Sequence, residues 1–257
     1  MGILNVTPDS FFDSFNHLDI RDDNNQKILN DLSYADIIDI GAESSRPGAN
    51  PISVDEEITR IKLILPSLEA FKDKELSIDT YNYETAKFAL SNQFSMVNDI
   101  RGGQDDRMLE LVSSYNSKIV LMHMQGSPEN MQNSPKYDNI IDELMIFFEN
   151  RVNKAIKYGI SENNIIIDPG IGFGKTIEHN NSIIMNFNKL KALNFPLLIG
   201  ISRKSFLSYD NDSPSERLTQ TLAVSSYLIE KGIDYLRAHD VFETRKMLTI
   251  LNGIINN

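Results

Sequence analysis

Three pieces of sequence decide the fold: DIIDIG (36–41), SVDEEITRIKLILPSL (53–68) and ELSID (75–79). The first and third are short apolar runs, which are typical of buried strands. The middle piece repeats apolar residues at helical spacing, and Ser53 followed by Glu56 predicts a capping box at its start. A strand, a helix and a second strand in this order predict parallel strands joined by a helical crossover.

The same alternation continues along the whole chain, which has no linker and no break in composition. Ser213, followed by Pro214 and Glu216, predicts a second capping box. The strand candidates are residues 2–6, 36–41, 75–79, 95–99, 118–122, 164–168, 197–202 and 234–238. This order predicts a single (β/α)8 TIM barrel that occupies residues 1–257 as one domain, with a doubly wound sheet as the alternative.

Composition excludes several classes of function. The net charge of −11 argues against nucleic acid as a partner, because phosphate backbones need a basic face. No apolar run reaches the ~20 residues that a membrane span needs. The chain has no cysteine, which excludes disulfides and a cysteine nucleophile and is compatible with a reducing compartment. We therefore expect a cytoplasmic protein that acts on small molecules.

Nearly every strand candidate ends in polar or charged residues. In a barrel the carboxyl ends of all the strands meet on one face, where the loops that follow them build the active site. Any one such residue is typical of a turn or a helix cap, but caps need no Arg, Lys and His beside them. The residues concerned are Asn5, 43–46, Asp79, Asn98, Asp99, His123, Asp168, 202–204, Arg237 and His239.

The strand-end acceptors are Asp79, Asn98 and Asp168. Two carboxylates and an amide facing one hollow suit a ligand rich in N–H donors, such as the edge of an aminopyrimidine. A carboxylate pair for acid–base chemistry and a cage for a divalent metal are two further readings that spacing alone leaves open.

The strand-end cations are Arg46, Arg203, Lys204, Arg237 and His239. Arg237 and His239 lie two residues apart and therefore point to the same side of a strand. Strand one neighbours strand eight in a closed barrel, so Asn5 joins them. The three predict a phosphate-binding corner, which the last strands of such barrels often provide.

The glycine-rich run GIGFGKT (170–176) resembles a phosphate-binding P-loop, but its spacing is wrong. The P-loop has four residues between its first glycine and the glycine before lysine, and this run has three. A loop between a strand and a helix fits better. It would place Phe173 at the barrel mouth, against the flat face of a ligand.

Eight motifs together resemble the dihydropteroate synthase family of pterin-binding enzymes, in order and over almost the whole chain. They are GILNVTPDSF (2–11), DIGAESSRPGA (39–49), SIDT (77–80), VNDIRGG (97–103), LMHMQGSPENMQ (121–132), DPGIGFGK (168–175), SRKS (202–205) and RAHDV (237–241). The resemblance implies a transferase that joins a pterin diphosphate to p-aminobenzoate. It further implies a homodimer, a Mg²⁺ cofactor and competition by sulfonamides.

The resemblance also assigns residues to roles. The implied pterin pocket is Asp79, Asn98, Asp168 and Lys204. The implied diphosphate site is Asn5, Ser45, Arg46, Arg237 and His239, with Asn5 also a ligand of Mg²⁺. The implied p-aminobenzoate site is Thr7, Pro8, Ser45, Arg46, Pro47, Phe173, Lys204 and Ser205. The implied catalytic residues are Asp168, Lys204, Arg237 and His239.

The chain departs from the family pattern in its first two loops. Phe12 and Phe15 make the first loop bulkier than usual, and the second has Ala42 for a glycine and Ser45 for a threonine. Two alternatives stay open: a pterin-dependent methyltransferase domain, which would not need SRKS or RAHDV, and a pterin-binding paralogue without activity.

Overall fold

The computed structural model of the protein describes residues 1–7, 23–44 and 48–255. Each of the eight predicted strand ranges contains one observed strand, so these predictions are confirmed. The strands are β1 (Gly2–Asn5), β2 (Ile37–Gly41), β3 (Glu75–Asp79), β4 (Met96–Asp99), β5 (Lys118–Met122), β6 (Ile165–Asp168), β7 (Leu198–Gly200) and β8 (Tyr235–Arg237).

The strands follow one another around a ring in chain order. Strands β1 to β6 form one parallel sheet, and β7 and β8 form a parallel pair. A parallel bridge between Ile167 and Leu197 joins β6 to the pair, and a second one between Gly2 and Ala238 returns it to β1. Doubly wound sheets reverse the strand order at a switch point, whereas this ring never reverses. The predicted barrel is confirmed, and the doubly wound alternative is wrong.

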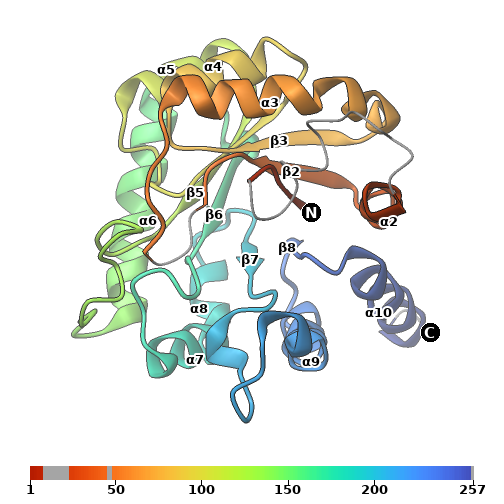
Figure 1. Ribbon diagram of the computed structural model, residues 1–257. Helices are drawn as coiled ribbons and strands as arrows, with labels where there is room; N and C mark the ends of the chain where they lie inside the picture. Colours follow the sequence, from red (N-terminus) through yellow and green to blue (C-terminus); the bar gives the residue numbers. More distant parts are fainter. Residues whose placement is uncertain (8–22, 45–47, 256–257) are drawn as a thin grey trace.

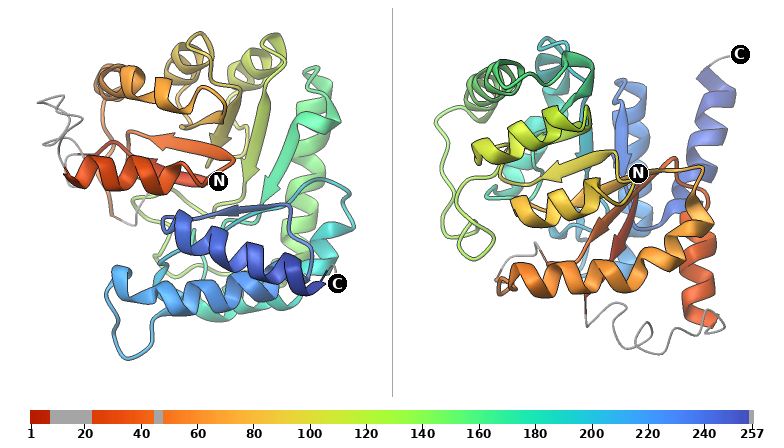
Figure 2. Two further views of the ribbon diagram at one scale, coloured as in Figure 1. Left: turned by 90° about the vertical axis from the view of Figure 1, so that its right-hand side faces the viewer. Right: turned by 90° about the horizontal axis from the view of Figure 1, so that it is seen from above.

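Helices surround the strands on the outside of the ring (Figures 1 and 2). They are α2 (Asp23–Leu32), α3 (Val54–Leu68), α4 (Tyr83–Leu90), α5 (Asp106–Ser114), α6 (Ile140–Lys157), α7 (Ile177–Met185), α8 (Phe187–Lys191), α9 (Leu218–Glu230) and α10 (Val241–Ile255). In the described part of the chain, none of these helices has the length and apolar character that crossing a bilayer requires.

The two predicted capping boxes differ in outcome. Ser53 caps α3 by accepting the Glu56 N–H at 3.2 Å, but the Glu56 carboxylate accepts from Arg60 at 2.9 Å. The box at Ser213 is complete, and it starts the 3₁₀ helix η5 (Pro214–Arg217) that leads into α9.

The inside of the barrel changes from apolar to polar along the strands. A cluster of buried apolar side chains fills its lower part: Ile37, Met96, Val120, Ile166 and Leu198. Side chains two residues further along a strand point to the same side. Asp39, Asn98 and Asp168 therefore lie above Ile37, Met96 and Ile166, at the end of the barrel where the strands finish.

Candidate active site

Arg237, at the end of β8, links two carboxylates across the barrel mouth. Its Nε donates to Asp39 Oδ2 at 2.6 Å, and its Nη2 donates to Asp79 Oδ2 at 2.7 Å. Burial lowers the pKa of this guanidinium, but Asp39 and Asp79 more than offset that effect and raise it on balance. Sequence analysis grouped Arg237 with the cations of a phosphate corner. The structure shows it in ion pairs with two carboxylates, and its role at a phosphate stays a prediction.

Asp39 is a central acceptor that sequence analysis missed. It is fully buried in β2, and it also accepts from Ser77 Oγ at 2.6 Å and from Asn98 Nδ2 at 3.0 Å. An aspartate on the inward face of a buried strand was the available signal, because such residues are almost never buried without partners. We call Asp39, Asp79 and Asn98, together with Arg237, which donates to both carboxylates, the acceptor cluster.

Asp79 is the last residue of β3 and is the second carboxylate that Arg237 binds. Burial raises the pKa of its carboxyl group to about 7, although Arg237 acts to lower it. A Cβ atom added to Gly41 would lie 3.5 Å from Asp79 Oδ2 and 3.7 Å from Asn5 Oδ1. The side chains of Asn5 and Asp79 therefore face the same space above the end of β2.

Asp168 and Lys204 form the other side of the mouth. Asp168 is buried at the end of β6, and its Oδ1 accepts the Gly170 N–H at 2.7 Å. Burial raises the pKa of Asp168, whereas Lys204 acts to lower it. Burial also lowers the pKa of Lys204 to about 8, against the effect of Asp168. The Lys204 ammonium donates to the Ile171 carbonyl and lies 4.6 Å from the centre of the Phe173 ring.

Residues 169–176, which we call the glycine loop, connect β6 to α7 and lie directly on the loop that follows β5. Gly170 has a positive φ of 66°, and an added Cβ there would lie 2.0 Å from the His123 carbonyl oxygen. Gly174 has a φ of 61°, and its Cβ would lie 2.5 Å from the Gln125 carbonyl oxygen. Only glycine allows this close contact between the two loops.

A lysine buried in this loop also escaped sequence analysis, which read it as part of a false P-loop motif. Lys175 Nζ lies 3.0 Å from His123 Nδ1 and donates to the Phe173 carbonyl at 2.9 Å. Burial lowers the pKa of Lys175 to about 7 and that of His123 to about 3. His123 is therefore neutral near pH 7, and its Nδ1 accepts from the ammonium.

The predicted phosphate corner stays a prediction, and the structure describes the surroundings of one of its members. His239 sits beside Ser202, whose Oγ accepts the His239 N–H at 3.1 Å and lies 3.1 Å from Nδ1. Arg203, another of the strand-end cations, makes two bonds to the Asp240 carboxylate, at 3.0 and 2.5 Å.

Of the predicted p-aminobenzoate residues, Thr7 and Phe173 are half-buried, and Ser205 is exposed in the 3₁₀ helix η4 (Ser205–Leu207). Pro8, Ser45, Arg46 and Pro47 lie outside the described residues, as do Phe12 and Phe15. Their predicted roles stay predictions.

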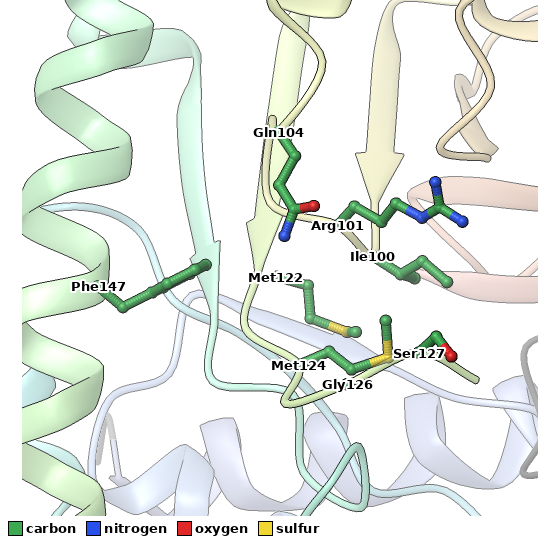
Figure 3. A pocket seen from close by; sticks show the side chains of 8 residues that line it. All are labelled: Ile100, Arg101, Gln104, Met122, Met124, Gly126, Ser127 and Phe147. Atoms are coloured by element: carbon green, nitrogen blue, oxygen red, sulfur yellow. The ribbon is translucent and has the colours of Figure 1, made fainter. Parts of the chain in front are cut away.

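A cavity of about 180 Å³ lies between the loops after β4 and β5. In Figure 3 Met122 and Met124 lie side by side within it, and Phe147 reaches toward it from α6. The remaining lining residues are Ile100, Arg101, Gln104, Gly126 and Ser127. The lining includes no member of the acceptor cluster, so this cavity adjoins the candidate site and is not its centre.

Comparisons with known proteins agree with this geometry. Residues 1–239 match the family described as pterin binding enzyme. The dihydropteroate synthase of Synechocystis sp. is 42% identical over 94% of this chain and 84% of its own length.

Solved structures give the same result for the fold. The Yersinia pestis dihydropteroate synthase with a sulfonamide drug complex has a TM-score of 0.91 and 36% identity, over 100% of this chain and 94% of that one. The Clostridium difficile enzyme in the presence of pteroic acid has a TM-score of 0.89 and 36% identity, over 100% and 96%. The chain belongs to the pterin-binding enzymes and, within them, to the dihydropteroate synthase family.

Proposed function

We propose that the protein condenses 6-hydroxymethyl-7,8-dihydropterin diphosphate with p-aminobenzoate, giving 7,8-dihydropteroate and diphosphate. The observation that carries the proposal is the set of acceptors inside the barrel mouth, of which Asp39, Asn98 and Asp168 are buried and Asp79 is 12% exposed. A pterin ring presents several N–H donors on one edge, and buried carboxylates accept such donors strongly.

Different residues of the site bind different groups of the pterin. Asp79, Asn98 and Asp168 accept from its N–H groups, and Lys204 donates to an acceptor of the ring. Arg237 holds Asp39 and Asp79 in place through its two bonds, so it orients the acceptors from below. These bonds support a role for Arg237 at the pterin as well as at the diphosphate.

The reaction needs no covalent intermediate with the protein. The amine nitrogen of p-aminobenzoate forms a bond to the exocyclic methylene of the pterin, the bond from that carbon to the diphosphate oxygen breaks, and the amine releases a proton. Positive charge that develops on the pterin methylene is stabilised by the buried carboxylates. His239 and Asn5 face the departing diphosphate.

The donor set fits a Mg²⁺ ion that arrives with the diphosphate. Mg²⁺ in proteins often binds one or two side chains together with substrate phosphates, and Asn5 offers one amide oxygen at the mouth. Among the described residues no cluster of three or more His, Cys, Asp or Glu could hold a metal alone. When bound, Mg²⁺ would stabilise negative charge on the leaving group.

We place p-aminobenzoate above the glycine loop, beside the Phe173 ring and the Lys204 ammonium, which contact each other. Thr7 and Ser205 lie in segments that border this space, together with the residues of the first two loops named above. The amine of the ligand would then point inward, toward the pterin.

A steady-state assay tests the proposal. Purified protein, the pterin diphosphate, p-aminobenzoate and Mg²⁺ should yield dihydropteroate and diphosphate in equal amounts. Tight pterin binding without release of diphosphate would refute the proposed activity and favour a paralogue without turnover. Methyl transfer from methyltetrahydrofolate would instead favour the methyltransferase alternative.

A cytoplasmic homodimer stays a prediction. Ile146 on α6 and Ile177 and Met185 on α7 are exposed by 59%, 54% and 76%, which supports an interface on this side of the barrel. Light scattering of the purified protein would measure its mass in solution.

A further inference from the structure

Lys175 is buried without a charged group among its hydrogen-bond partners. It is 3% exposed, and its ammonium reaches the Phe173 carbonyl at 2.9 Å, His123 Nδ1 at 3.0 Å and the His123 carbonyl at 3.3 Å. Below its lowered pKa of about 7, the Lys175 ammonium has three N–H donors, and these three acceptors use all of them. Burying a charge in this way is costly, so the side chain needs a reason beyond packing.

The contacts join two loops. His123 directly follows β5, whereas Phe173 lies at the centre of the glycine loop. Two further bonds run between the same segments: Gln132 Nε2 donates to the Gly172 carbonyl at 2.5 Å, and Tyr137 Oη donates to the Gly174 carbonyl at 2.8 Å. The glycine loop is thus held by hydrogen bonds to its carbonyl groups. Of the three donor side chains, Lys175, Gln132 and Tyr137, Lys175 is the buried one.

The glycine loop carries Phe173, whose ring faces Lys204. Lys175 binds the carbonyl of Phe173, while the ring of the same residue lies 4.6 Å from Lys204 Nζ. On the other side, a Cβ added to Gly172 would lie 3.2 Å from Lys204 Cδ. The path of the glycine loop therefore sets the distance between the Phe173 ring and the Lys204 ammonium.

We propose that Lys175 and His123 form a positioning pair that holds the Phe173 ring against Lys204 and so shapes the p-aminobenzoate half of the site. This inference rests on the proposed function, because that function places p-aminobenzoate beside these two side chains. The pair touches neither substrate. It acts through the backbone of the glycine loop.

The acceptor cluster is independent of this pair. Its members belong to β2, β3, β4 and β8, and they are bonded to one another through side chains. Two other proposed pterin residues, Asp168 and Lys204, contact the glycine loop at Gly170 and Ile171, but these contacts do not involve Lys175 or His123. Loss of the pair should therefore change the use of p-aminobenzoate more than the binding of a bare pterin. A purely structural role would weaken both together.

The test uses Lys175→Met, which keeps the length of the side chain and removes its donors. The matched control is Lys72→Met, an exposed lysine that precedes β3 at the opposite end of the barrel. We expect the KM for p-aminobenzoate to rise at least ~10-fold in Lys175→Met, with the Kd of a bare pterin changed less than about twofold. Lys72→Met should match the wild type in both.

A second variant keeps the test decisive if Lys175→Met does not fold. His123→Leu removes the imidazole acceptor and should show the same split between the two ligands. In the double variant the two losses should not add, because each single change breaks the same contact. Equal losses for both ligands, or no loss for either, would overturn the inference.

The same measurements separate this inference from the proposed function. A wild-type protein that binds p-aminobenzoate without turnover refutes the activity alone, and the variants then test the pair through the Kd of p-aminobenzoate. An active wild type with unchanged variants refutes the pair alone. A wild type that binds no p-aminobenzoate overturns both.

Discussion

The acceptor cluster and the glycine loop face the same barrel mouth but are held in different ways. Members of the acceptor cluster project from strands and satisfy one another through charged side chains. The glycine loop is held through backbone carbonyl groups by Lys175, Gln132 and Tyr137. A substitution in the acceptor cluster therefore leaves a buried charge unpaired, whereas loss of a donor to the glycine loop allows the backbone of that loop to shift.

Arg237→Ala should produce the largest effect, because it removes the partner of two carboxylates at once. Breaking a buried ion pair from one side costs about 3–5 kcal/mol in the free energy of unfolding. Urea unfolding at pH 7 measures this loss, and an assay of bare pterin should show weaker binding as well. Arg107→Ala, at an exposed pair with Asp105, is the control and should leave stability near that of the wild type.

The pH dependence of Arg237→Ala gives a further check. Without the guanidinium, the already raised pKa of Asp79 should rise further. Above about pH 7 the folded variant then keeps a proton that the folded wild type has lost, so the stability deficit of the variant shrinks as pH falls toward 7 and changes little below it. A deficit that stays constant from pH 9 to pH 7 would contradict the assignment of Asp79 as the unpaired partner.

Asp39→Asn should have the next largest effect. Three donors converge on this carboxylate, and an amide can offer only one acceptor atom to them. We expect a loss of about 2–3 kcal/mol in the free energy of unfolding, and weaker binding of bare pterin. Asp36→Asn is the control, since that side chain is 77% exposed near the start of the same strand. Similar losses in both variants would contradict a special role for Asp39.

Arg237 and Asp39 also show which features of the site the sequence could predict and which it could not. Each strand was predicted correctly because short apolar runs between helical segments leave few other structures. The convergence of Asp79, Asn98 and Asp168 followed from the barrel itself, since all the strands end on one face. Asp39 was missed because DIIDIG reads as an apolar strand, although its aspartate was the anomaly.

The partners of Arg237 could not be predicted. The guanidinium reaches Asp39 across 198 residues of sequence, and spacing within RAHDV says nothing of which strand it faces. Lys175 was hidden for a different reason: GIGFGKT attracts attention to phosphate, whereas its lysine binds carbonyl groups of the chain itself. Pairing across a barrel is tertiary information, and local pattern carries little of it.

Titration of Lys175 should give an effect of the opposite sign to that of Asp79. Burial and Lys204 lower its folded pKa to about 7, against Asp168, whereas an unfolded lysine titrates near 10.4. Between these values the unfolded state binds the proton and the folded state does not, so the free energy of unfolding rises with pH. Unfolding curves from pH 6 to pH 10 should show this rise in the wild type and a smaller rise in Lys175→Met, where Lys204 still contributes. Parallel curves would show that the buried amine does not titrate in this range.

Ser202→Ala should have the smallest effect. It tests whether His239 is held in a third way, by a neutral hydroxyl group. The Ser202 hydroxyl holds His239 through its backbone N–H and its ring, with no charge and no glycine loop involved. Loss of one such bond costs about 1 kcal/mol, which corresponds to roughly a fivefold change in an equilibrium constant. We expect the KM for the pterin diphosphate to rise by that factor while the Kd of bare pterin stays constant, because His239 faces only the diphosphate. Ser202→Thr keeps the hydroxyl and should behave as the wild type. If Ser202→Ala weakened bare pterin as well, His239 would have to be reassigned to the pterin, and the diphosphate would be left with Asn5, Arg237 and the residues of the second loop.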